Sequence, residues 1–154
     1  MSESSENLVR ENQLKKAGEI IASACKWSAA TAVIPMPLVD VAALAAVQAS
    51  MVSEIAKLYG QSYSGDAAKS TVSVLLGTLL PSALLNGIKF TPGVGAIVGV
   101  ASHAVVGAAA SYAVGKVMVR HFENGGTVAS FDAQSVGDEL KMEFASAKGK
   151  VRPA

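Results

Sequence analysis

Charged and aromatic residues are scarce in this 154-residue chain. Asp, Glu, Lys and Arg make up 16% of it, against about 25% in a typical soluble domain, and Phe, Trp and Tyr make up 5%. The formal net charge of +1 gives no electrostatic basis for binding nucleic acid, which excludes that class of partner. Cys25 is the one cysteine, so an intramolecular disulfide is excluded and a reducing compartment is expected.

Motifs for reaction chemistry are also missing. Gly115-Lys116 fails the phosphate-loop pattern, because Val117 follows the lysine and Ala110 occupies the upstream glycine position. The glycines near residue 95 have the wrong spacing for a dinucleotide fingerprint. Two distant histidines and one cysteine make no metal site, and no serine has a clear basic partner. We therefore expect a non-enzymatic protein that needs no metal or cofactor.

Small aliphatic residues dominate what is present. Hydrophobic residues make up 51% of the chain and the mean hydropathy is +0.39, mostly through Ala, Val and Leu. Apolar periodicity and the placement of Pro and Gly predict an all-α fold of closely packed helices. A polar lead-in runs into the first helix within residues 1–33, and a second helix is expected over 37–59, with Gly60 as its stop.

Two long stretches lack Asp, Glu, Lys and Arg, namely residues 70–88 and 90–115. The second stretch would span about 39 Å as a helix, against a hydrocarbon thickness of about 30 Å. We therefore predict one helical domain over residues 1–126, containing an apolar helical hairpin over 66–121 that is embedded in a membrane. Residues 127–154 are expected to add a weak amphipathic helix and a flexible basic tail. A soluble bundle or oligomer with a buried hairpin is the alternative.

A ridge of small residues at four-residue spacing runs along the second half of this hairpin. Such a ridge lets two helix backbones approach closely, and the preceding apolar segment is the expected partner. A glycine inside a helix costs up to about 1 kcal/mol relative to alanine, so a packing role is indicated. The ridge residues are Gly95, Gly99, His103, Gly107, Ser111 and Gly115.

The histidine in this ridge, His103, has two interpretations. As a structural group it would hydrogen-bond a facing hydroxyl, such as that of Ser73, Thr78 or Ser82. As a functional group it would handle protons or ions, because ionisable residues within a membrane are rare and often functional.

Two groups of residues resemble the signature of a bacterial family. The family is the YcjF-like family of uncharacterised membrane-associated domains, often fused behind Era-like GTPase domains. The resemblance covers roughly residues 15–126 and implies a helical, membrane-associated module. This chain carries no GTPase, so a nucleotide-driven role would need a GTPase partner in trans. The matching residues are Ile34-Pro35-Met36-Pro37, Asp40, Gln48, Met51 and Leu58-Tyr59-Gly60, followed by Tyr112, Gly115, Arg120, Phe122 and Gly125-Gly126.

Asp40 and Gln48 have both a structural and a functional interpretation. They can serve as a helix cap and an ordinary face residue, or they can form a polar docking patch for a partner helix or a GTPase.

The leading hypothesis is a membrane-associated anchor or assembly module in the cytoplasmic membrane, forming homo-oligomers. Lys69, Lys116 and Arg120 flank the hairpin, whereas only Lys89 lies in its turn, which places both termini on the cytoplasmic side. A soluble cytoplasmic homo-oligomeric scaffold or shell is the main alternative, and a channel or transporter subunit is a weaker one.

Overall fold

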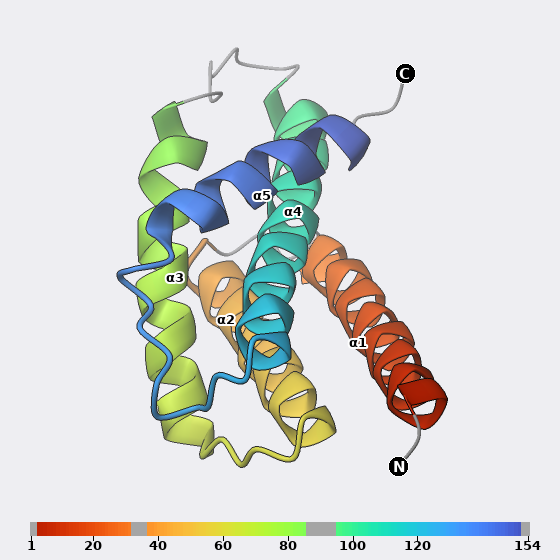
Figure 1. The fold of residues 1–154 in the computed structure, drawn as a ribbon. Helices are drawn as coiled ribbons and strands as arrows, with labels where there is room; N and C mark the ends of the chain where they lie inside the picture. Colours follow the sequence, from red (N-terminus) through yellow and green to blue (C-terminus); the bar gives the residue numbers. More distant parts are fainter. Residues whose placement is uncertain (1–2, 32–36, 86–94, 152–154) are drawn as a thin grey trace.

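A computed structural model describes the backbone of residues 3–31, 37–85 and 95–151, and the side chains of these residues except 37–41, 80–85, 95–103 and 151. The regular elements in this part of the chain are five helices (Figure 1): α1 (Glu3–Thr31), α2 (Pro37–Leu58), α3 (Gly65–Leu85), α4 (Gly95–Glu123) and α5 (Gly137–Val151). The predicted all-α fold is confirmed.

Proline and glycine mark the helix ends as predicted. α2 begins at Pro37, where the missing amide hydrogen costs nothing. Gly60 and Gly125 follow α2 and α4 with φ angles of 72° and 79°, in the left-handed region that glycine enters without a Cβ clash. The predicted polar lead-in is helical from Glu3 onward, since Glu3 and Glu6 place carboxylates in the first turn, near the positive end of the helix dipole.

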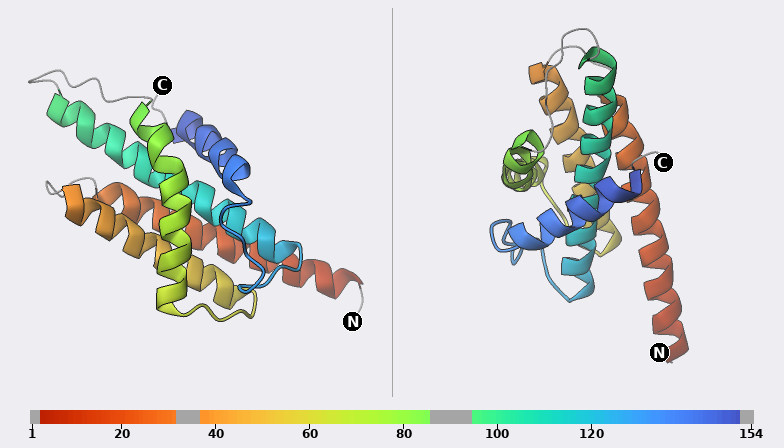
Figure 2. Two further views of the ribbon diagram at one scale, coloured as in Figure 1. Left: turned by 90° about the vertical axis from the view of Figure 1, so that its left-hand side faces the viewer. Right: turned by 90° about the horizontal axis from the view of Figure 1, so that it is seen from above.

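Three helices run side by side and set the long axis of the molecule (Figure 2). α1 is antiparallel to α4, because Arg10 contacts Glu123 at one end and Ser28 contacts Ser111 at the other. α2 is parallel to α4, because Gln48 contacts Ser111 and the chain just after α2 contacts Glu123 through Tyr59. α3 is steeply inclined to this group, and α5 crosses over α3 and α4 (Figures 1 and 2).

The core lies where α2, α3, α4 and α5 converge, and its residues are mostly aliphatic. Several of the largest side chains in it are fully buried, each from a different helix or a successive turn of one helix. Because aromatic rings are few, the core is filled by branched and sulfur-containing side chains that pack at short helix separations. The largest of the buried apolar side chains are Met51, Ile55, Leu75, Met118 and Leu140.

The segment after residue 126 contributes to this same core. Leu140, Phe144 and Ala147 of α5 are buried together with residues from the other helices. The amphipathic helix predicted after residue 126 is present, but the basic residues Lys148 and Lys150 lie within it, where a flexible tail was expected. α5 therefore completes the domain that was predicted to end at residue 126.

The predicted hairpin forms two helices, α3 and α4, but they do not pack as a continuous pair. α3 crosses α4 at a steep angle, so it cannot follow one ridge of α4 over five turns (Figure 2). In the part of α4 whose side chains are described, the small residues face α1, as shown below. None of the helices, within the residues that the structure describes, is both long and apolar enough to cross a membrane.

The burial of α5 gives a matched test of its place in the domain. We expect Leu140→Ala to lower the free energy of unfolding by about 2–5 kcal/mol, because it removes a fully buried side chain and leaves a cavity. Met142→Ala, two residues away and 68% exposed, should change it by no more than about 0.5 kcal/mol. Chemical denaturation measures both variants. Equal effects would show that α5 does not share the core.

Candidate functional site

α1 packs tightly on two glycines of the predicted ridge in α4, with its backbone at Gly107 and with the Ile21 side chain at Gly115. A Cβ atom added to Gly107 would lie 2.8 Å from the carbonyl oxygen of Ser28, and one added to Gly115 would lie 2.5 Å from Cγ1 of Ile21. Real Cβ contacts are longer than both distances. The partner of this part of the ridge is therefore α1, whereas the preceding apolar segment, now α3, was expected.

A small cluster of polar side chains is buried between α1, α2 and α4, next to Gly107. The Ser28 and Ser111 hydroxyl oxygens lie 2.6 Å apart, and the Gln48 amide nitrogen donates to the Ser111 hydroxyl over 3.3 Å. All three side chains are at most 1% exposed. Among the residues whose side chains are described, none gives the Gln48 Oε1 atom a hydrogen bond. The hydrogen bonds of this cluster fix the relative positions of three helices. Because buried polar groups normally have hydrogen-bond partners, the unpaired Gln48 oxygen lowers the stability of the folded state.

The other predicted site residues are placed as follows. Gly95, Gly99, His103 and Asp40 all lie in segments whose side-chain surroundings the structure does not describe. Of the hydroxyls considered for His103, those of Ser73 and Thr78 donate to carbonyl oxygens of their own helix, Lys69 and Val74 respectively, and Ser82 is also outside the described part.

Gln48 does not lie on the surface, where a docking residue was expected. It is 0% exposed and points into the helix interface. The proposed polar docking patch therefore cannot include Gln48 unless the helices separate.

Cys25 lies at the same interface. Its thiol donates to the carbonyl oxygen of Ala108 over 3.3 Å. Desolvation by burial raises the pKa of the Cys25 thiol, although a hydrogen bond from the residue's own backbone lowers it by a smaller amount. Because the thiolate is the nucleophilic form, Cys25 is a packing residue with weak reactivity at neutral pH.

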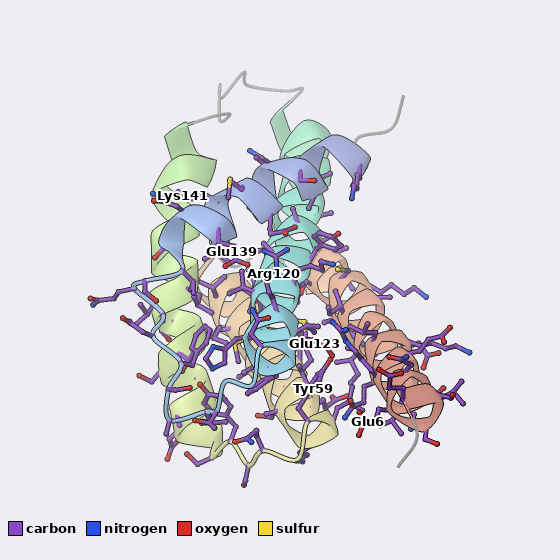
Figure 3. All side chains as sticks on the ribbon, viewed as in Figure 1. Glu6, Tyr59, Arg120, Glu123, Glu139 and Lys141 are labelled. Carbon is purple, nitrogen blue, oxygen red and sulfur yellow. The ribbon has the colours of Figure 1, made fainter. Side chains whose placement is uncertain are left out.

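A second polar cluster, at the C-terminal end of α4, was not predicted from the sequence. Glu123 accepts a hydrogen bond from the Tyr59 hydroxyl at 2.9 Å and pairs with the Arg10 guanidinium at 2.6 Å (Figure 3). The Tyr59 ring stacks on Phe122, with centroids 5.7 Å apart. Glu123 therefore joins α1, the end of α2 and α4. Tyr59 and Glu123 each lie one or two residues before a helix-ending glycine, which was the only signal in the sequence.

Burial and the neighbouring carboxylate hold Tyr59 in its neutral form. Desolvation raises the pKa of Tyr59 well above its usual value, and the hydrogen bond to Glu123 raises it further. A neutral phenol in this position is a hydrogen-bond donor. The Tyr59 phenol therefore serves at neutral pH as a donor that links the end of α2 to Glu123.

Arg120 forms a third polar contact, which ties α4 to α5. Its guanidinium pairs with both Glu139 and Glu143, and the Glu143 pair is 3.1 Å long (Figure 3). The guanidinium is half exposed, so each pair contributes at most about 1 kcal/mol. Arg120 is therefore an exposed link to α5.

His121 and Ser130 lie close enough to suggest a nucleophile and its base, but their hydrogen bonds exclude that role. His121 Nε2 lies 2.8 Å from the Thr127 carbonyl oxygen, which can only accept, so this nitrogen carries a proton. The Ser130 hydroxyl lies 3.4 Å from the same nitrogen and thus cannot transfer its proton there. The ring also meets the edge of Phe131, with centroids 5.0 Å apart. His121 therefore anchors the loop that follows α4.

Metal chemistry finds no support in the described part of the chain, where no three His, Cys, Asp or Glu residues are grouped to hold an ion. The polar contacts described above join helices to one another and to the loop after α4.

Comparison with known proteins gives two matches. The chain matches the family DUF697, a domain of unknown function, over residues 1–148. It is 31% identical over 153 residues to Magnetosome membrane protein 22 of Magnetospirillum gryphiswaldense, which covers 96% of this chain and 74% of that protein. No solved structure matches the chain.

The contact at Gly107 generates a sharp stability test. We expect Gly107→Ala to lower the free energy of unfolding by about 1–3 kcal/mol, because the added methyl group would collide with the Ser28 carbonyl and push α1 away from α4. Gly18→Ala in α1 is the control, since nothing lies within 4 Å of its added Cβ. That variant should gain up to about 1 kcal/mol from helix propensity. A gain in both variants would exclude close packing at Gly107.

The raised pKa of Tyr59 predicts a loss of stability at alkaline pH. An unfolded tyrosine releases its proton near pH 10, whereas folded Tyr59 keeps it to higher pH, so above about pH 10 the folded state binds more protons. The free energy of unfolding should therefore fall as pH rises through this range. In Tyr59→Phe the fall should be shallower, which denaturation curves at several pH values would measure. If the free energy of unfolding fell equally steeply with pH in Tyr59→Phe and in the wild type, Tyr59 would not be the group responsible.

Proposed function

The chain belongs to the DUF697 family, and from this premise we propose that it is a non-enzymatic, membrane-associated helical module that acts as an anchor or assembly platform. The observation that carries the proposal is the alignment with a protein named as a magnetosome membrane protein. That alignment includes 96% of this chain, so the likeness extends over the helical unit as a whole.

The described side chains support this proposal in two ways. The polar clusters at Ser111 and Glu123 position helices and hold no activated nucleophile, as their hydrogen bonds indicate. The long uncharged stretches, residues 70–88 and 90–115, have the composition of segments that enter lipid. Lys69, Lys116 and Arg120 lie at the ends of these stretches that are away from the turn between them. Because basic residues favour the cytoplasmic side of a membrane, both termini would lie on that side.

A soluble homo-oligomeric scaffold is the second candidate, and one observation favours it. Four large apolar side chains of α1 are exposed, namely Leu8 at 60%, Val9 at 52%, Leu14 at 42% and Trp27 at 66%. A second copy of the chain could cover them. The family resemblance adds a GTPase in trans as a proposed partner for either form.

Fractionation separates the two candidates. The expressed protein, released from cells without detergent and centrifuged at high speed, should pellet with the membranes. It should be released by detergent and not by high salt, because apolar burial does not depend on screening of charge. A discrete assembly that stays in the supernatant would overturn the membrane proposal and support the scaffold.

A further inference from the structure

The parallel group of α1, α2 and α4 has a common register. Ser28 of α1 and Gln48 of α2 both meet Ser111 of α4. Arg10 of α1 and Tyr59, just after α2, both meet Glu123. Residues on the three helices can therefore be compared by their height along one common axis. We call the height of Ser111 the Ser111 level and the height of Glu123 the Glu123 level.

Charged residues are distributed very unevenly along this axis. Near the Glu123 level lie Glu54 and Lys57 of α2 and Lys116 and Arg120 of α4, besides the N-terminal half of α1. Beyond the Ser111 level, α4 has no Asp, Glu, Lys or Arg back to its start at Gly95, and α2 has Asp40 alone. The end of α1 after Trp27 also has none. One end of the bundle is thus charge-poor in all three helices.

Aromatic residues and lysines lie at the boundary of this charge-poor end. Trp27, next to Ser28, is 66% exposed and lines a hollow between α1 and α2 with Ala46 and Val47. On α4, Tyr112 follows Ser111, and the Lys150 ammonium of α5 lies 5.5 Å from its ring centroid. Lys26 precedes Trp27 and is exposed.

This arrangement has the features of a membrane interface. Trp and Tyr favour the headgroup level, where an apolar ring and a polar edge are both satisfied, and nearby lysines extend toward water. Beyond this level α4 continues back to Gly95 for about 24 Å at 1.5 Å per residue. That length lies between about 15 Å for one half of the hydrocarbon layer and about 30 Å for the whole layer.

We propose that the charge-poor end of the bundle inserts into the hydrocarbon layer of a lipid bilayer, to the depth marked by Trp27 and Tyr112. The inference rests on the proposed membrane association and adds the inserted surface and its depth. It leaves the Glu123 end and its charged residues in water.

Trp27 is the single tryptophan of the chain and so reports on this depth directly. The purified full chain is mixed with phosphatidylcholine–phosphatidylglycerol vesicles, binding is measured by co-sedimentation, and the emission spectrum is recorded. Emission of Trp27 should shift to shorter wavelength and should be quenched by vesicles that carry brominated acyl chains. The control is Trp27→Phe with Ala129→Trp, which moves the tryptophan to an exposed loop position at the Glu123 end and should show neither change.

The outcomes distinguish this inference from the function on which it rests. Co-sedimentation with no change in Trp27 emission, or with equal changes at both positions, would overturn the inserted surface and leave membrane association intact. A lack of co-sedimentation would overturn both. A blue shift that appears without vesicles and grows with protein concentration would show that a second copy covers Trp27, against insertion.

A charge substitution gives a second measurement that does not depend on fluorescence. Ala46→Glu places a carboxylate in the exposed hollow beside Trp27, so it should weaken vesicle binding several-fold without disturbing the core. Ala67→Glu, at an exposed position in the first turns of α3, is the matched control and should bind as the wild type does. Equal binding by both variants would overturn the proposal.

Discussion

The close approach of the α4 backbone at Gly107 to the α1 backbone at Ser28 is the constraint on which the rest of the bundle depends. Only a residue without a Cβ fits there, since an added methyl carbon would lie 2.8 Å from a backbone oxygen that cannot move independently of its helix. At this separation α1 contributes mainly small residues, Ala17, Ala24 and Ser28, to the interface, and its one large buried side chain, Ile21, lies over Gly115. Dispersion contacts between small groups, summed along the helices, replace a large apolar layer.

The polar contacts follow from this close approach. With α1 and α4 this close, the hydroxyls of Ser28 and Ser111 come within 2.6 Å of each other, and Gln48 of α2 is buried against them. The same register brings Arg10 and Tyr59 to Glu123 at the other end of α4. A shift of α1 by one turn would break both clusters at once, which makes the register strongly specified.

The distribution of polar and charged groups also bears on the proposed function. Its polar groups are used to align helices, and its charged groups are gathered near the Glu123 end, which leaves the other end poor in charge. Such a division suits the proposed insertion of the charge-poor end into an apolar phase. It also accounts for the scarcity of aromatic residues, because closely packed small residues have little space for rings.

The sequence by itself determined the local features. Proline, glycine and charge placement located α2 and the ends of α2 and α4, because Pro37, Gly60 and Gly125 act through their own backbone geometry. The small-residue spacing identified Gly107 and Gly115 as unusual, but it could not identify their neighbour, since any helix can pack on such a ridge. Tertiary structure decided that α1 packs there, that Gln48 is buried, that Tyr59 and Arg10 share Glu123, and that α5 belongs to the core. These features depend on how helices distant in the sequence meet. Each contact requires two helix faces that fit each other and a particular alignment of the two helices along their length, and neither segment alone encodes that alignment.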